Sequence, residues 1–157
     1  MEEKKKTTWF GNPTVNDIEW MYKDTLADAL HIRVTEVGDD YIKGTMPVDA
    51  RTKQPYGILH GGASVSLAET LGSIASGLIV DPENFIAVGI EINANHLAAV
   101  SSGTITGICK PIRCKGSIHV WEIKMTDDSG ELICISRFTC KCISKSKLGT
   151  LNRGSKS

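Results

Sequence analysis

Two periodicities of apolar residues run along the chain, one typical of helices and the other of strands. The clearest helical pattern covers residues 63–80, where apolar side chains recur every three or four positions. These are Leu67, Leu71, Ile74 and Leu78. Asp81-Pro82 then ends the helix, because the residue before a proline disfavours helical geometry. A second helix, with looser spacing, is predicted from its cap Asn16 to about Ala29.

Strand-like patterns make up most of the remaining chain. They cover residues 32–37, 41–48, 85–95, 103–113, 117–126 and 131–143. The turns Gly38-Asp39-Asp40 and Asp127-Asp128-Ser129-Gly130 each predict a hairpin. This order predicts an α+β fold, in which one antiparallel sheet wraps around one long helix and the last four strands form a meander. We expect the other face of such a sheet, or its edge, to meet another subunit.

Length and charge limit the possible functions. The 157 residues fit a single domain, predicted over residues 16–145, with flexible segments at 1–15 and 146–157. Eighteen basic residues balance eighteen acidic ones, so nucleic acid is not an expected partner. No apolar run approaches the ~20 residues of a membrane span, and the charged start of the chain is not followed by an apolar signal segment.

The five cysteines give information on compartment and cofactors. Their odd number, without an export signal, predicts a reducing, cytoplasmic location. We interpret them as small core or surface residues. No histidine or second cysteine pair provides the spacing of a tetrahedral zinc site, so no metal cofactor is expected.

Candidate chemistry gathers around the start of the long helix. His60-Gly61-Gly62 would leave free backbone N–H groups at the helix N-terminus, where an oxyanion can bind. On the face opposite the leucines, Glu69 can serve as a base or nucleophile, and Gln54 lies upstream. The other residues predicted on this polar face are Gly72, Ser73 and Ser76. The set fits an acyl-transfer site, but its spacing also fits a glycine-rich loop that simply starts a helix with a solvated face.

A group of cations lies near the end of the strand predicted at 103–113. Lys110, Arg113 and Lys115 fall within six residues, beside Gly116. Such a group fits a clamp for a phosphorylated ligand, and it equally fits a solvated turn.

Several short stretches carry a resemblance to a known family. They are MPVD (46–49), QPYGILHGGAS (54–64), LAETLGS (67–73), GIEINANH (89–96) and GICKP (107–111). Over roughly residues 25–143 the chain resembles the hotdog-fold acyl-CoA thioesterases, in particular the branch of the 1,4-dihydroxy-2-naphthoyl-CoA hydrolases and the enterobactin proofreading thioesterases. The resemblance implies a hotdog fold and hydrolysis of an aromatic acyl-CoA, as in menaquinone synthesis, to free acid and coenzyme A without a cofactor. The first 20 residues do not follow this branch.

The resemblance also implies catalytic roles. Glu69 would attack the thioester or activate water, and the Gly61 N–H would polarise the carbonyl. Gln54 and His60 would position the carbonyl and the water, with Ser73 assisting. In this family the site spans a dimer interface, with the carboxylate from one subunit and the oxyanion residues from its neighbour, and the dimers usually pair into tetramers.

Further residues are implied in binding coenzyme A. Those lining its channel would be Gly89, His96, Leu97, Ala98 and Ala99, and those meeting its phosphates would be Arg113, Cys114, Lys115, Gly116, Ser117 and Ile118. Family members often carry Arg or Lys shortly after the strand-end histidine. Here Leu97-Ala98-Ala99 follows, which leaves Arg113 and Lys115 as replacements.

Two other functions fit the same residues. A hotdog hydratase or dehydratase would use His60 and Glu69 for proton transfer. A non-catalytic acyl-CoA-binding module would bind the thioester without releasing a thiol.

Overall fold

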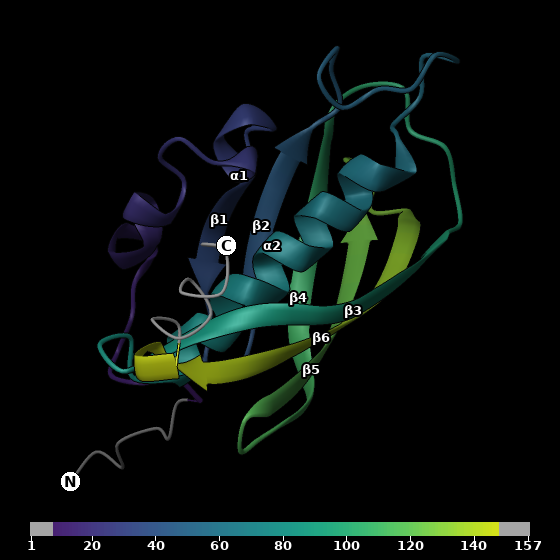
Figure 1. Ribbon diagram of the computed structural model, residues 1–157. Helices are drawn as coiled ribbons and strands as arrows, with labels where there is room; N and C mark the ends of the chain where they lie inside the picture. The colour runs from purple at the N-terminus through teal and green to yellow at the C-terminus, as the bar shows by residue number, and fades with distance from the viewer. Residues whose placement is uncertain (1–7, 148–157) are drawn as a thin grey trace, which may run out of the picture.

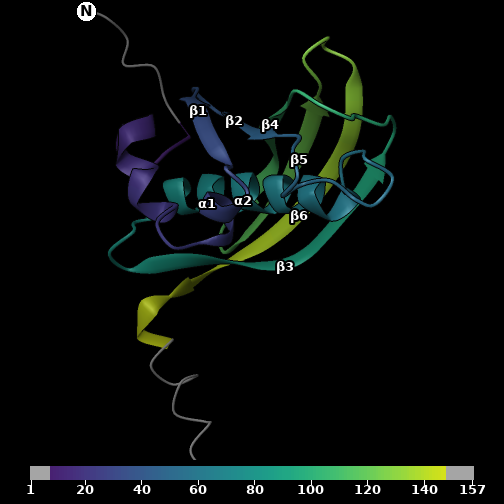
Figure 2. The ribbon, with the colours of Figure 1, turned by 90° about the horizontal axis from the view of Figure 1, so that it is seen from above.

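In the computed structural model, which describes residues 8–147, one long helix lies in the curve of a six-stranded antiparallel sheet (Figures 1 and 2). The helical elements are η1 (Val15–Met21), α1 (Leu26–Ala29) and α2 (Gly61–Ile79). The strands are β1 (Arg33–Val37), β2 (Ile42–Pro47), β3 (Phe85–His96), β4 (Thr104–Lys115), β5 (Ile118–Thr126) and β6 (Leu132–Ser144). The predicted α+β class and hotdog arrangement are confirmed. Of the ends predicted to be flexible, residues 1–7 and 148–157 lie outside the described residues.

The long helix forms where its apolar pattern predicts, starting two residues earlier. Leu67 and Leu71 are fully buried against the sheet. Two strand glycines permit this close packing, because a Cβ at Gly107 would lie 2.8 Å from the Leu71 side chain and one at Gly44 would lie 2.6 Å from it. Any larger residue at these positions would push the helix away from the sheet.

The predicted polar face of Glu69, Gly72, Ser73 and Ser76 is accessible only in part, because Gly72 and Ser76 are buried. Ser76 is fully buried, and its hydroxyl accepts a 2.7 Å hydrogen bond from the Trp121 indole N–H. A Cβ at Gly72 would lie 2.3 Å from the Phe138 ring. The curved sheet covers both flanks of α2, so of these four residues Glu69 and, in part, Ser73 remain accessible.

The strand order is β1-β2-β4-β5-β6-β3, which corrects the predicted four-stranded meander. β4, β5 and β6 do follow one another, and both predicted hairpins form. β3, however, pairs with β6 at the far edge, with Ala87 opposite Cys142 and His96 opposite Cys134. Residues 97–103 contain no tight hairpin turn, and they carry the chain past the sheet to β4 (Figure 1).

The predicted helix 16–29 is instead two short pieces. Asp24 has φ of 58°, in the left-handed region, which interrupts any continuous helix. Each piece has its own cap: the Thr14–Asp17 capping box starts η1, and the Thr25 hydroxyl caps α1. The local hydrogen-bonding residues therefore outweigh the loose apolar spacing.

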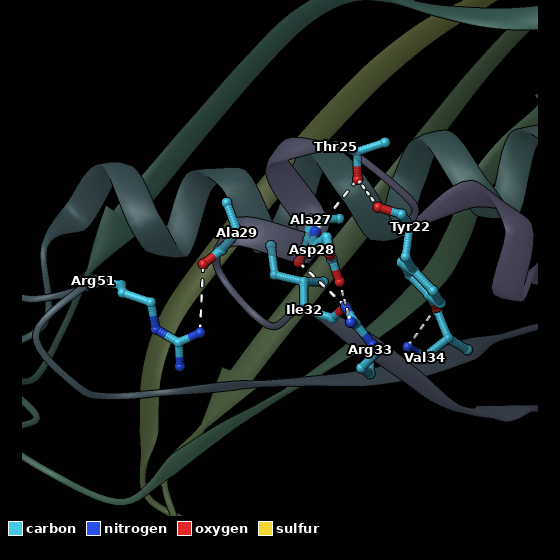
Figure 3. Close-up of polar contacts among 9 residues, drawn as sticks. All are labelled: Tyr22, Thr25, Ala27, Asp28, Ala29, Ile32, Arg33, Val34 and Arg51. Carbon is cyan, nitrogen blue, oxygen red and sulfur yellow. Dashed lines mark hydrogen bonds and ion pairs between the residues drawn. The ribbon is translucent and has the colours of Figure 1, made fainter.

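Polar contacts hold this N-terminal segment against β1 (Figure 3). The Val34 N–H donates to the Tyr22 hydroxyl at 2.8 Å, and the Arg33 guanidinium lies over the Tyr22 ring, 4.7 Å from its centroid. Arg33 also pairs with Asp28 and donates to the Ile32 carbonyl at 2.8 Å. Residues 20–27 are thereby fixed beside the accessible face of α2.

Within residues 8–147, none of the helices has the length and apolar content needed to cross a bilayer.

Candidate active site

The start of α2 presents a free backbone donor. The His60 ring accepts a 2.8 Å hydrogen bond from the Gly62 N–H through Nδ1, which makes His60 the helix N-cap. The N–H groups of Ala63 and Ser64 donate to the His60 carbonyl. Among residues 8–147, the Gly61 N–H has no acceptor. It therefore remains available, at the positive end of the helix dipole, for the oxygen of a ligand.

The loop before α2 is held by internal hydrogen bonds. The buried Thr52 hydroxyl donates to the Pro47 carbonyl at 2.8 Å, and the Thr52 carbonyl accepts from the His60 N–H at 2.8 Å. The Gln54 side-chain oxygen accepts from the Tyr56 N–H at 3.1 Å. Gln54 is thus near His60 in the chain but directs its carbonyl oxygen into its own loop.

A pocket of about 390 Å³ lies beside Gly61. Its wall includes His96, Leu97, Ala98 and Ala99, all of which the resemblance assigns to the coenzyme A channel. The His96 ring lies so close that a Cβ at Gly61 would be 2.7 Å from its Nε2. Gly61 and most of the residues of the predicted channel therefore line one pocket.

Glu69 lies farther along α2, on its exposed face. It lines a second pocket of about 280 Å³ together with Ser73. Gly89, at a bulge in β3, packs against it: a Cβ there would lie 2.9 Å from Glu69 Oε1. Gly89 thus belongs to the carboxylate's surroundings rather than to the pocket that contains His96.

A single chain does not bring the carboxylate and the Gly61 N–H together. Eight residues separate Gly61 from Glu69 on one helix, which corresponds to about 12 Å along its axis.

The cationic hairpin between β4 and β5 is also far from the His96 pocket. Ile118 lies opposite Lys141, which in turn lies opposite Val88, so the hairpin is level with the first half of β3, while His96 ends that strand. Arg113 and Lys115 are exposed there. Cys114 differs from them, because burial and the neighbouring Cys140 raise the pKa of its thiol to about 12. The protonated thiol is a poor nucleophile at neutral pH.

Residues of the N-terminal segment line the Glu69 pocket and were missed by the sequence reasoning. Met21 and Tyr22 of this segment face Glu69 and Ser73 across the pocket. The segment does not follow the family resemblance, and its loose spacing does not indicate a binding role, so no signal in the sequence identified it.

Comparison with known proteins adds three observations. The family model described as the thioesterase superfamily matches residues 56–134. The 1,4-dihydroxy-2-naphthoyl-CoA hydrolase of Escherichia coli K12 is 44% identical over 131 residues, which cover 83% of this chain and 96% of that protein. The proofreading thioesterase EntH of Cronobacter turicensis is 43% identical, over 83% of this chain and 95% of that protein.

Solved structures agree with these matches. A thioesterase from Pseudomonas aeruginosa superimposes with a TM-score of 0.85 at 40% identity, covering 88% of this chain and 99% of that chain. A thioesterase from Haemophilus influenzae gives a TM-score of 0.84 at 40% identity, covering 88% of this chain and 96% of that chain.

Proposed function

Because this chain belongs to the thioesterase superfamily and is a thioester hydrolase, we propose that it hydrolyses an aromatic acyl-CoA to the free acid and coenzyme A, in the cytoplasm, at a site formed by two copies of the chain. The name of the Escherichia coli relative, 1,4-dihydroxy-2-naphthoyl-CoA hydrolase, supports an aromatic acyl group. The proposal of a shared site rests on one observation about β3. The accessible Glu69 lies beside Gly89, and Gly61, with its free N–H, lies beside His96, which is seven positions farther along the same edge strand.

The free edge of β3 can form the contact through which two copies complete each other's active sites. β3 is twelve residues long and, within residues 8–147, pairs only with β6 (Figure 2). A second copy can add its own β3 antiparallel to this edge. If Gly89 lies opposite His96 of the partner subunit, Glu69 approaches Gly61 of the partner subunit, and two-fold symmetry forms the second site in the same way. Such dimers would pair further into tetramers.

The reaction follows from these positions. The thioester carbonyl oxygen accepts a hydrogen bond from the Gly61 N–H of the partner subunit, which stabilises the negative charge that develops on it. The Glu69 carboxylate either takes a proton from the attacking water or attacks the carbonyl carbon itself, forming an anhydride that water then cleaves. In both routes the C–S bond breaks, coenzyme A leaves as the thiol after taking up a proton, and the acid is released. Ser73, one turn beyond Glu69, together with His60 of the partner subunit and Gln54 of the partner subunit, orients the water and the acyl group, and no metal or other cofactor takes part.

The same pairing gives the cationic hairpin a role. With Gly89 opposite His96 of the partner subunit, Val88 lies opposite Leu97 of the partner subunit. The Arg113–Ile118 hairpin of one copy is then level with the coenzyme A pocket of the other. Arg113 and Lys115 are therefore suited to contact the nucleotide phosphates.

A thiol-release assay over a panel of acyl-CoA thioesters tests the activity. We expect release from aromatic thioesters, with the free acid identified by mass spectrometry. Addition or loss of water with the thioester intact would instead identify a hydratase or dehydratase. Saturable binding without thiol release would identify a binding module.

A mixing experiment tests whether the site is shared. Gly61→Pro removes the N–H donor at a position where proline suits a helix, and the extended geometry of His60 is compatible with a following proline. The control, Gly61→Ala, keeps the N–H and measures the cost of the added Cβ alone. Co-expressed Glu69→Ala and Gly61→Pro chains should recover about a quarter of wild-type activity, because half of the randomly formed dimers contain one intact site. No recovery would place both groups in the same subunit.

A further inference from the structure

The pocket at Glu69 continues as an apolar groove towards the C-terminal end of α2. The continuation has a volume of about 300 Å³ and shares Met21, Ser73 and Ile74 with the Glu69 pocket, so the two are one channel. Gly77 on α2, Trp20 on η1 and Phe85 on β3 surround its far part. From Glu69 to Gly77 the channel follows α2 for eight residues, about 12 Å.

Gly77 keeps the groove open. A Cβ at this position would meet no atom within 4 Å, whereas one at Gly72, on the same helix, would meet the Phe138 ring at 2.3 Å. Close packing against the sheet thus explains the glycine at 72 but not the one at 77. A Cβ at Gly77 therefore has open space around it, beside the groove that Gly77 lines.

Trp20 also lines the groove and contributes little to the core. It is 71% exposed, while Trp9 and Trp121 are buried and stack on each other. An exposed indole beside an apolar groove offers a large, rigid contact surface to a ligand. The capped and hydrogen-bonded segment that carries it keeps this indole beside the groove.

We propose that this groove receives the distal part of an elongated, apolar acyl group, and that Gly77 and Trp20 set the longest acyl group that the enzyme hydrolyses. The inference rests on the proposed function, since the groove has this role only if the thioester carbonyl lies at Glu69. Among the described residues that line the far part of the groove, Lys145 is the one with a charged side chain. The groove therefore suits methylene or aryl groups rather than a polar chain. Each methylene buried there should strengthen binding roughly fourfold.

A chain-length series provides the kinetic test. The wild type and the variants Gly77→Ala, Gly77→Val and Gly77→Phe would be assayed with butyryl-, hexanoyl-, octanoyl- and decanoyl-CoA. The measured quantity is the ratio of kcat/KM for octanoyl-CoA to that for butyryl-CoA, which cancels any loss common to all substrates. We expect this ratio to fall stepwise with side-chain size and to fall at least roughly tenfold in Gly77→Phe. Replacing a helix glycine favours the helix, so these variants should fold.

Binding provides a readout that is independent of turnover. A non-hydrolysable octyl ketone analogue of the acyl-CoA should cover Trp20 and shift tryptophan emission to shorter wavelength, whereas a propyl analogue should not. The shift should disappear in Trp20→Phe. Ile108→Ala, which removes an exposed apolar side chain from β4, is the matched control and should keep the shift.

The outcomes separate the two proposals. Three results would overturn the role of the groove and leave the thioesterase site intact. They are thiol release from aromatic acyl-CoA but not from octanoyl-CoA, an octanoyl-to-butyryl ratio that does not change with the side chain at position 77, and an emission shift that persists in Trp20→Phe. Failure of the wild type to release thiol from any acyl-CoA would overturn the proposed function, and the role of the groove with it.

Discussion

β1 and β3 are the two edge strands of the sheet, and within residues 8–147 each has one edge that no other strand covers. The two strands differ in what the rest of the chain places beside them. Along β1, the N-terminal segment supplies the Tyr22 hydroxyl for the Val34 N–H and an ion pair to Arg33 (Figure 3). Along β3, apolar side chains remain exposed, Ile90 at 56% among them. Long, exposed strand edges invite pairing with another chain, and proteins normally protect them. The comparison indicates that β1 is closed by the chain itself, whereas β3 stays open, at the edge where we propose that a second copy pairs.

The largest effect on activity is expected for Glu69, the accessible carboxylate beside β3. Glu69→Ala should lower kcat roughly a thousandfold, because it removes the carboxylate that we propose acts on the thioester carbonyl. KM should stay within a few fold, since the carboxylate binds no part of coenzyme A. Steady-state thiol release measures both values, and a variant with near wild-type turnover would refute the role of Glu69.

A change in the β3 edge should affect assembly. Ile90→Lys places a charge where the partner strand would pack, so it should weaken dimerisation roughly tenfold or more and reduce activity in proportion. Ile112→Lys is a matched control, because Ile112 is 57% exposed and also lies at a strand bulge, but on β4. Light scattering over a dilution series gives the dissociation constant. Equal effects of the two substitutions would show that β3 is not the dimer edge.

The cationic hairpin should have an intermediate effect. The double variant Arg113→Ala/Lys115→Ala should raise KM for an acyl-CoA about tenfold, because two phosphate contacts are lost. For the same acyl group on N-acetylcysteamine, which lacks the nucleotide, KM should hardly change. An equal change for both thioesters would exclude contact with the phosphates.

The smallest effect is expected at the β1 edge. Tyr22→Phe removes the hydroxyl that accepts from Val34 and should lower the free energy of unfolding by about 1 kcal/mol. Thermal denaturation should show a decrease of a few degrees in Tm. Tyr41→Phe, which removes a more exposed hydroxyl bonded to Glu36, serves as the control and should have a smaller effect. A larger loss in Tyr41→Phe would show that the Tyr22 contact does not secure this edge.

The sequence predicts those features that depend on local pattern. The leucine stripe indicates α2, and the turn residues at 38–40 and 127–130 indicate both hairpins. It does not predict that β3 crosses to the far edge, because nothing local to β3 specifies its partner. The burial of Ser76 was also unpredictable, since it depends on sheet curvature and on Trp121, which lies 45 residues away.

Part of the candidate site also follows from local signals. The glycine-flanked helix start and Glu69 are local signals, and the structure leaves both accessible. That Gly89 accommodates the carboxylate and His96 lies against Gly61 could not be deduced from spacing, because these pairs meet only when β3 passes along α2. The N-terminal wall of the groove depends on the kink at Asp24, which the apolar pattern does not reveal.

The roughly 12 Å between Gly61 and Glu69 on one helix has a consequence for gene duplication. If the site is shared as proposed and two copies were fused in tandem, each of the two centres would take its acid from one half and its glycine turn from the other. One half could then lose its acid and the other its glycine turn, and a single working centre would still remain. Such fused descendants would carry complementary losses in their two halves, a pattern that an enzyme with its whole centre in one subunit would not leave.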